Sequence, residues 1–183
     1  RFERPVPEKW RVAMKLYHGS NIVIEHINLA MCRPFKDFGK GFYLTDIKEQ
    51  AEKMAKRVSK IYGGDPVVNA FEIDENFKDL LDIRIKDFGT QTTEEWAKFV
   101  MNNRNRAFTN EQDALCNKDN KYDIVIGPVA DDNMALLFRQ YENEIIDFST
   151  LLKGMIYKET SSQYSFHTEK AVRLLRKVDD LNG

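Results

Sequence analysis

Three short strings of the chain carry side chains suited to recognising a small polar ligand. In LYHGS, His18 offers a ring nitrogen, Gly19 leaves its backbone open to close approach, and Ser20 adds a hydroxyl. Together these groups can hold a carboxamide. In FGKGFYLT, Tyr43 follows two glycines around a lysine, and in QYSFHT the amide of Gln163 opens the string. Taken singly, each string also fits a plain structural role, such as a turn entering a core strand.

The order of the three strings is more specific than any one of them. LYHGS, then FGKGFYLTD with a helix behind it, then QYSFHTEKAVRLL resembles the ADP-ribosyltransferase superfamily. The similar branch has a histidine, a tyrosine and a glutamate-type residue on three separated strands, and poly(ADP-ribose) polymerases carry similar HGS and GKGxY strings. With YDIVIGPVADDN included, the pattern also resembles a bacterial family of uncharacterised ADP-ribosyltransferase-like domains, some in toxin–antitoxin-like settings. The resemblance covers Met14 to Val178.

The resemblance implies NAD as a cosubstrate, no metal, and a role for each matching residue. His18 would hydrogen-bond the adenosine ribose, while the Gly19 backbone and Ser20 would hold the nicotinamide carboxamide. Tyr43 would pack its ring against the nicotinamide, because the face of an aromatic ring tolerates a cationic pyridinium. Gly41, in the GKG string, is expected to contact NAD. Gln163 would orient the 2′-hydroxyl of the nicotinamide ribose, and the three side chains would converge in one cleft.

Two positions depart from the pattern of the resembling branch. A glutamate at position 163 would add negative charge beside the developing oxocarbenium-like centre. Gln163 keeps the hydrogen bond through its carbonyl oxygen but brings neither the charge nor a proton acceptor. We therefore expect mono-ADP-ribosylation of an acceptor that needs little deprotonation or whose base comes from elsewhere. Glu159 is a candidate base or else a solvated surface charge. Met54 stands where poly(ADP-ribose) polymerases commonly place another stacking tyrosine.

Alternatives of other classes stay open at this point. The same fold could hydrolyse NAD to ADP-ribose and nicotinamide, or be a catalytically inactive module that binds NAD or a partner. A nucleotide 2′-phosphotransferase is a fourth reading, but the arginine pattern expected there is not evident. The expected partners are a macromolecular acceptor, protein or nucleic acid, and a cognate antitoxin if the toxin-like resemblance extends to function.

Other reactive side chains have ordinary explanations beside the functional ones. Lys40 could reach a phosphate of NAD or be solvated, and His167, four residues past Gln163, could line the cleft from the same strand face. Asp131 and Asp132 suit helix capping better than metal binding. His26 belongs to no motif.

The elements that must position these residues can be read from hydrophobic periodicity. Strands are predicted at 14–20, in the run leading to Thr45, at 67–73, at 122–128 and finally at 163–168, with 80–88 extending or pairing with the third. Helices are predicted at 47–62, with Asp46 as N-cap and Glu49 completing a capping box, and at 92–104, 130–142 and 169–178. Because strands and helices do not alternate strictly, we expect an α+β, ADP-ribosyltransferase-like split β-sheet core with surrounding helices.

Length and composition set the outer limits of these hypotheses. The 183 residues suit one domain over 14–183, and residues 1–13 read as a leader or expression remnant. The chain has 28 basic and 29 acidic side chains and a net charge of −1, so its overall charge does not attract it to nucleic acid or to an anionic membrane. Cys32 and Cys116 form no CxxC pair, so we expect two buried or half-buried thiols. No segment has the length of a membrane span or the apolar core of a secretory signal, so a cytoplasmic protein is expected.

Overall fold

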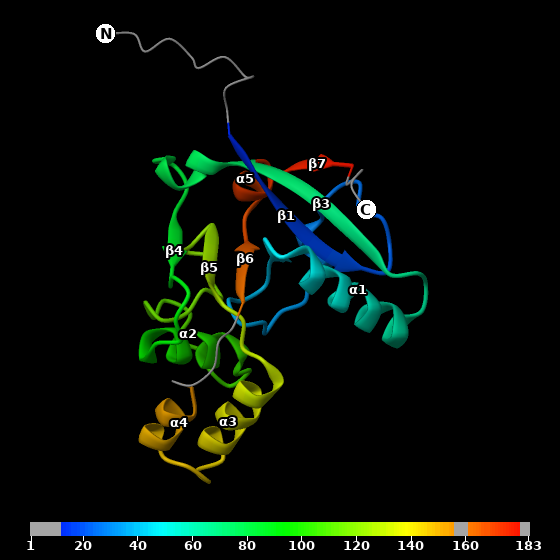
Figure 1. Cartoon of the computed structure of the whole chain (residues 1–183). Helices are drawn as coiled ribbons and strands as arrows, with labels where there is room; N and C mark the ends of the chain where they lie inside the picture. Colours follow the sequence, from blue (N-terminus) through cyan, green and yellow to red (C-terminus); the bar gives the residue numbers. More distant parts are fainter. Residues whose placement is uncertain (1–11, 156–160, 180–183) are drawn as a thin grey trace, which may run out of the picture. The chain divides into compact units, whose positions relative to one another are not determined.

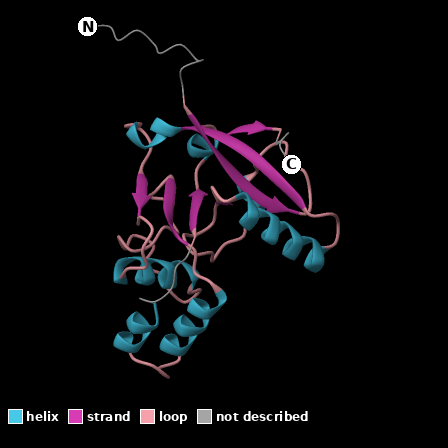
Figure 2. Cartoon of the chain, viewed as in Figure 1, coloured by secondary structure: helices cyan, strands magenta, loops and turns pink. Residues whose placement is uncertain are grey.

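A computed structural model describes residues 12–155 and 161–179 (Figure 1). The described chain mixes helices with two separate β-sheets, which confirms the α+β class (Figure 2). It divides into two compact units, each built from segments distant in sequence. The first unit holds residues 12–26, 44–83 and 173–179, and the second holds 27–43, 84–155 and 161–172. The single domain over 14–183 stays a prediction.

The first unit is organised by a three-stranded antiparallel sheet. Its strands, in spatial order, are β1 (Ala13–Ser20), β3 (Val67–Asp74) and β7 (Arg176–Val178). Leu16 pairs with Phe71 across β1 and β3, and both side chains are buried. Two residues further along, His18 pairs with Asn69. The predicted strands at 14–20 and 67–73 are therefore confirmed.

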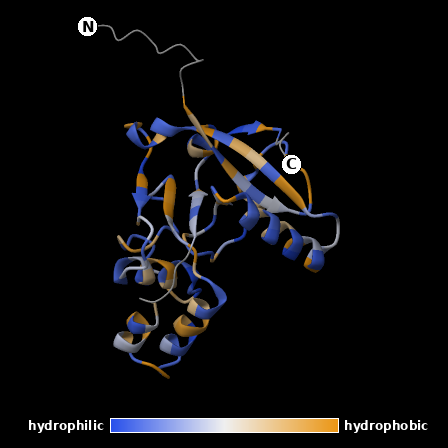
Figure 3. Ribbon diagram, viewed as in Figure 1, coloured by the Kyte–Doolittle hydropathy of each residue, from blue (hydrophilic) through white to orange (hydrophobic). Residues whose placement is uncertain are grey.

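Helix α1 (Lys48–Tyr62) packs on β1 in the same unit and is otherwise strongly hydrophilic (Figure 3). Its buried positions are alanines, Ala51 and Ala55, so the helix backbone comes close to the sheet. The predicted Asp46 cap is wrong, because the N-cap residue is Ile47 and it makes no side-chain capping bond. The Thr45 hydroxyl instead accepts from Ile47 N at 3.1 Å and sets the turn before the helix.

The second unit contains a four-stranded sheet, of which only Leu44, the last residue of one strand, is counted with the first unit. In spatial order its strands are β2 (Phe42–Leu44), β6 (Ser162–Phe166), β5 (Ile124–Pro128) and β4 (Ile85–Asp87). All of β5 is buried, as its β-branched run predicts. The expectation that 80–88 extends or pairs with the strand at 67–73 is wrong, because β4 runs parallel to β5. The Arg84 backbone N–H donates to the Asp123 carboxylate at 2.8 Å, and Asp123 N donates back to Arg84 O at 2.8 Å.

Three helices complete the core of the second unit: α2 (Glu94–Arg104), α3 (Asp132–Glu142) and α4 (Phe148–Met155). The predicted cap at Asp131 is confirmed, because its side chain accepts from Met134 N, and in α2 the side chain of Thr93 accepts from Trp96 N in the same way. Trp96 is fully buried, and its indole N–H donates to Pro128 O at 3.1 Å. The indole thus fixes α2 against the end of β5.

The loop after α2 is held by two lysines that point inward. Lys121 Nζ donates to the carbonyl oxygens of Glu111, Asp113 and Cys116 at 2.9, 2.5 and 2.9 Å. Lys118 Nζ donates to two more carbonyls and lies 5.5 Å from the ring centroid of Phe35. These ammonium groups satisfy backbone carbonyls that a loop would otherwise turn to water.

The C-terminal prediction of one helix over 169–178 is wrong in its second half. Helix α5 spans only Glu169–Val172, and the chain then forms β7, so β6 is not the final strand. Pairing with β3 decides the outcome, with Lys177 opposite Phe71 and an ion pair between Arg176 and Glu72. The apolar spacing in 169–178 fits a helix, but an open sheet edge competes for the same residues. In the described residues no helix has the length and apolar character to cross a membrane.

Candidate functional site

Tyr43 lies in β2, an edge strand of the second unit, and its hydroxyl turns back onto the loop before the strand. The hydroxyl donates to Gly39 O at 2.7 Å and accepts from Phe38 N at 3.0 Å. Gly39 has φ 95°, a conformation that suits glycine. Through its two hydrogen bonds to Phe38 and Gly39, the phenol oxygen fixes the start of the GKG loop. The ring face receives a cation, because Lys36 Nζ lies 5.2 Å from the ring centroid.

The Tyr43 hydroxyl is a hydrogen-bonding group rather than a base. Burial raises the pKa of this phenol well above its ordinary value of 10.0, and the negative charge of Asp37 raises the pKa further. The hydrogen bond from Phe38 N opposes these two effects only in part. At neutral pH the hydroxyl stays protonated, so any contribution of Tyr43 to ligand binding comes from its ring.

Gln163, in β6, has its side-chain amide fixed in one orientation. Nε2 donates to Asp37 Oδ2 at 2.9 Å and to Pro128 O at 3.3 Å. Both partners are acceptors, so the NH₂ group must face them. Among the described residues no donor reaches Oε1 of Gln163. The side chain thus presents a carbonyl oxygen that can accept a hydrogen bond.

Asp37 is the residue of this cluster that the sequence analysis missed. Its side chain is 15 % exposed, and besides Gln163 it binds Ala130 N at 3.2 Å and lies 3.5 Å from Arg104 Nη1. The same carboxylate acts on Tyr43, as its effect on the phenol pKa indicates. Asp37 therefore links the two residues of this unit that the resemblance singles out. In the sequence it is one aspartate in a glycine-containing loop, and nothing there separates it from a solvated turn residue.

His167 lies just beyond the end of β6 and is 3 % exposed, so it does not line an open cleft. Nδ1 lies 2.8 Å from Lys40 O and Nε2 lies 2.7 Å from the Ser165 hydroxyl. Because a carbonyl only accepts, Nδ1 carries the proton. Burial lowers the pKa of His167 to about 4, which leaves the ring neutral at physiological pH. A Cβ added to Gly41 would lie 2.6 Å from Nδ1, so packing on this ring already requires glycine at that position.

The HGS string lies in the first unit, and its glycine also has a packing reason. A Cβ on Gly19 would lie 2.1 Å from Ala51 O and 2.6 Å from Ala55 N of α1. Since neighbouring residues of a strand point to opposite faces, His18 and Ser20 lie on the face away from α1. His18 is half-buried, whereas Ser20 is 8 % exposed and its hydroxyl accepts from Ile22 N at 3.4 Å.

The loop after the HGS string is held by a buried amide. Asn69, 3 % exposed, accepts from Ile24 N at 2.8 Å and donates to Ile22 O at 3.1 Å. Because Asn69 also pairs with His18 across the strands, the position of this loop is tied to that of the histidine. His18 belongs to the first unit, while Tyr43 and Gln163 belong to the second. Their convergence in one cleft stays a prediction.

The remaining candidates divide by exposure. Lys40 is exposed, which agrees with its interpretation as a solvated side chain, and His26 is exposed as well. Met54 is 47 % exposed on α1. Asp131 is accounted for by helix capping. Glu159, the candidate base, lies outside the described residues. Cys116 is buried and Cys32 half-buried, and both are free thiols, as predicted.

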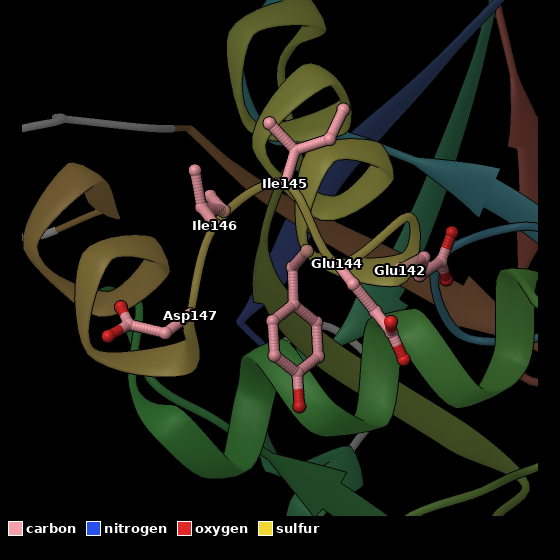
Figure 4. A pocket seen from close by; sticks show the side chains of 6 residues that line it. Glu142, Glu144, Ile145, Ile146 and Asp147 are labelled. Carbon is pink, nitrogen blue, oxygen red and sulfur yellow. The ribbon is translucent and has the colours of Figure 1, made fainter.

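Two hollows of the second unit lie away from this cluster. One, of about 570 Å³, lies at the turn between α3 and α4 and is lined by Tyr141, Glu142, Glu144, Ile145, Ile146 and Asp147 (Figure 4). The other, of about 360 Å³, runs along α2 and shares Tyr141 and Glu142 with the first. Neither is lined by Tyr43 or Gln163.

The comparison with protein families finds a match over most of the chain. The family described as "Protein of unknown function (DUF3990)" matches residues 14–176. The chain belongs to this family. The DUF3990 match spans all the candidate residues from His18 to Gln163, but its description assigns them no activity. No curated protein and no solved structure matched the chain. Within the described residues, His, Cys, Asp and Glu side chains form no group of three or more that could hold a metal ion.

Proposed function

We propose that this DUF3990 protein is an NAD-dependent ADP-ribosyltransferase that moves one ADP-ribose unit from NAD to a macromolecular acceptor, protein or nucleic acid. The single observation that carries the proposal is the fixed amide of Gln163. Both of its N–H groups are used within the protein, and no donor from the described part of the chain reaches its carbonyl oxygen. That oxygen is the atom with which Gln163 would orient the 2′-hydroxyl of the nicotinamide ribose.

The ring of Tyr43 supports the same reading. A positive charge, the Lys36 ammonium, lies over its face, and the nicotinamide ring of NAD is also positively charged. On binding, the nicotinamide would take the place of the Lys36 ammonium over the ring, and the side chain of Lys36 is exposed. His18 is assigned to the adenosine ribose, and Gly19 with Ser20 to the carboxamide. The structural reasons for Gly19 and Gly41 are compatible with these roles.

The reaction proposed for this site needs little from the protein. The N-glycosidic bond breaks with nicotinamide as the leaving group, and its electron pair stays on the pyridine nitrogen. The ribose carbon becomes oxocarbenium-like and forms a new bond to the acceptor, which loses a proton to solvent. Gln163 holds the ribose and Tyr43 holds the departing ring, so their contribution is orientation and electrostatic stabilisation.

The test is incubation of the chain with NAD labelled in its ADP-ribose part, alone and with lysate. Label on protein or nucleic acid supports transfer, and an extended labelled chain would contradict mono-ADP-ribosylation. Release of free nicotinamide with no labelled macromolecule would replace the proposal by NAD hydrolysis. Binding of NAD without any turnover would replace it by a binding module, and no binding at all would refute the assignment.

Single substitutions measure what each site side chain contributes to NAD binding and to turnover. We expect Gln163→Ala to reduce turnover roughly 10- to 100-fold, the range for losing one positioned hydrogen bond. His18→Ala and Tyr43→Ala should weaken NAD binding more than they slow turnover. The control is His26→Ala, an exposed histidine outside the motifs. Unchanged NAD turnover in all three site variants would show that the site lies elsewhere.

A toxin role belongs to the same proposal and is tested in cells. Induced expression in a bacterium should arrest growth, and Gln163→Ala should relieve the arrest at an equal protein level. Co-expression with neighbouring genes of the source genome would identify a cognate antitoxin by restored growth. Equal toxicity of the unaltered chain and the variant would detach any growth effect from this site.

A further inference from the structure

The carboxylate of Asp37 is mostly buried, with 15 % of the side chain exposed, and polar groups from three different segments of the second unit approach it. Nε2 of Gln163 donates to this carboxylate at 2.9 Å and the backbone N–H of Ala130 donates at 3.2 Å, while Nη1 of Arg104 forms an ion pair with it at 3.5 Å. They come from β6, from the segment before α3, and from the end of α2. These contacts hold the carboxylate in one place.

This carboxylate decides which way the Gln163 amide points. A glutamine can turn its NH₂ or its carbonyl oxygen toward a neighbour, but an ionised carboxylate only accepts. The reversed amide would set Oε1 against the negative oxygens of Asp37 and against Pro128 O, leaving the two amide hydrogens without these acceptors. Asp37 therefore keeps Oε1 on the side away from itself.

The same contact alters the charge on Oε1. A hydrogen bond from an amide N–H to a carboxylate draws the amide toward its polar resonance form, which places more negative charge on the carbonyl oxygen. One amide group beyond Oε1 there is also the full negative charge of Asp37. The pair thus combines an oriented acceptor with a nearby fixed negative charge, the two properties of a glutamate at position 163.

We infer that Asp37 is a positioning residue of the proposed reaction. It fixes the carbonyl oxygen of Gln163 toward the ribose hydroxyl and supplies, through Gln163, the negative charge that a glutamine lacks. This inference rests on the proposed ADP-ribosyltransferase function. It explains how a glutamine at position 163 can stabilise a developing positive charge.

The test exchanges donor and acceptor within the pair. Asp37→Asn leaves a side chain that can meet either end of the Gln163 amide, so the orientation is lost and kcat should fall roughly tenfold or more with little change in the KM for NAD. Gln163→Glu alone places two carboxylates at hydrogen-bond distance, so they share a proton and kcat becomes newly dependent on pH. In the double variant the asparagine at 37 donates to the glutamate at 163, and kcat should recover to well above that of Asp37→Asn.

A thermal-unfolding cycle on the same variants provides a readout independent of activity. Each single change should lower Tm, and the double variant should recover part of the loss because its hydrogen bond is restored. The matched control is Asp132→Asn, which removes an exposed negative charge from the same unit and should leave kcat unchanged. Retention of a cooperative transition shows that each variant folds.

The outcomes separate this inference from the proposed function. If the unaltered chain turns over NAD but Asp37→Asn has the same kcat, the inference is overturned and the transferase proposal stands. Additive Tm losses with no recovery in the double variant overturn the pairing itself. If the unaltered chain does not turn over NAD, the proposed function fails and the catalytic role of Asp37 fails with it, whatever the unfolding cycle gives. Recovery of both kcat and Tm in the double variant supports the inference.

Discussion

Mild acid should destabilise this protein through one buried histidine. His167 is 3 % exposed, and its neutral ring donates from Nδ1 to Lys40 O. In the unfolded chain the imidazole has its ordinary pKa of 6.5, whereas burial lowers the pKa of His167 to about 4 in the fold. Between these two pH values the unfolded chain binds a proton that the folded chain does not. The free energy of unfolding must therefore fall as the pH drops through that window.

The size of the loss follows from the same two values. At about 1.36 kcal/mol per pKa unit, the step from 6.5 to about 4 corresponds to a loss of about 3 kcal/mol, complete only below pH 4. This contribution is fully present above pH 6.5. Asp123 acts in a different window: burial alone would raise its pKa, but hydrogen bonds from Arg84, Thr168 and Lys170 hold it below 3.8. Stability from Asp123 is thus lost at lower pH than stability from His167.

The assay is urea unfolding at a series of pH values between 7.5 and 4. His167→Asn should be less stable at neutral pH, yet its free energy of unfolding should fall less steeply through the window, because the titrating ring is gone. His26→Asn, at an exposed position, is the control and should keep the steep fall. A wild-type curve that is flat between pH 6.5 and 4, or an unchanged slope in His167→Asn, would refute the reasoning.

Three further perturbations test the packing around the candidate residues. Gly19→Ala should displace α1 and cost more than about 3 kcal/mol, because its Cβ would meet the backbone of Ala51 at 2.1 Å, and thermal unfolding measures the loss. Gly41→Ala should cost about 1–3 kcal/mol by the same measurement, since its Cβ would lie 2.6 Å from the buried ring of His167. Lys121→Met should speed amide hydrogen exchange in the 105–121 loop, where three carbonyls lose their donor, and Lys121→Arg should not restore protection because a planar guanidinium spreads its donors differently.

Elements were predictable from the sequence wherever local patterns dominate. Helix α2 follows from the Thr93 cap and an apolar face that includes Trp96, and β5 follows from a β-branched run ended by Pro128. Both signals lie within a few residues of the structure that they specify. The capping box at Asp46 is a local signal too, but it competes with the hydroxyl of Thr45 one residue earlier, and the helix begins at Lys48.

The sequence-based predictions are wrong where a partner distant in the sequence determines the structure of a segment. The 80–88 segment has the alternation of a strand, but its sheet is chosen by contacts between Arg84 and Asp123, 39 residues away. The end of the chain has helical spacing, but Arg176 and its neighbours pair with β3, about 100 residues earlier. Periodicity reports which face of an element is apolar and not which element covers it.

The candidate site follows the same division. Tyr43 and Gln163 could be selected because they stand in recognisable strings, whereas Asp37 acquires its meaning from Gln163, 126 residues away. Arg104 is similarly ordinary as the last residue of a helix until it approaches that carboxylate. A single sequence holds no sign of such a pairing. Covariation between positions 37 and 163 across the DUF3990 family would be one.

The packing of the glycines changes how variants of the signature strings must be interpreted. Gly19 and Gly41 are both required by close contacts inside their own units, so loss of activity on replacing either would report on folding before it reported on NAD. The amide of Gln163 is different, because the fold uses its NH₂ group and leaves its carbonyl oxygen without a donor among the described residues. If position 163 served only the packing of the fold, an apolar side chain would fill it without requiring the carboxylate of Asp37 opposite it. The function of this protein is therefore best tested at Gln163 and Asp37, where the fold alone does not explain the choice of residue.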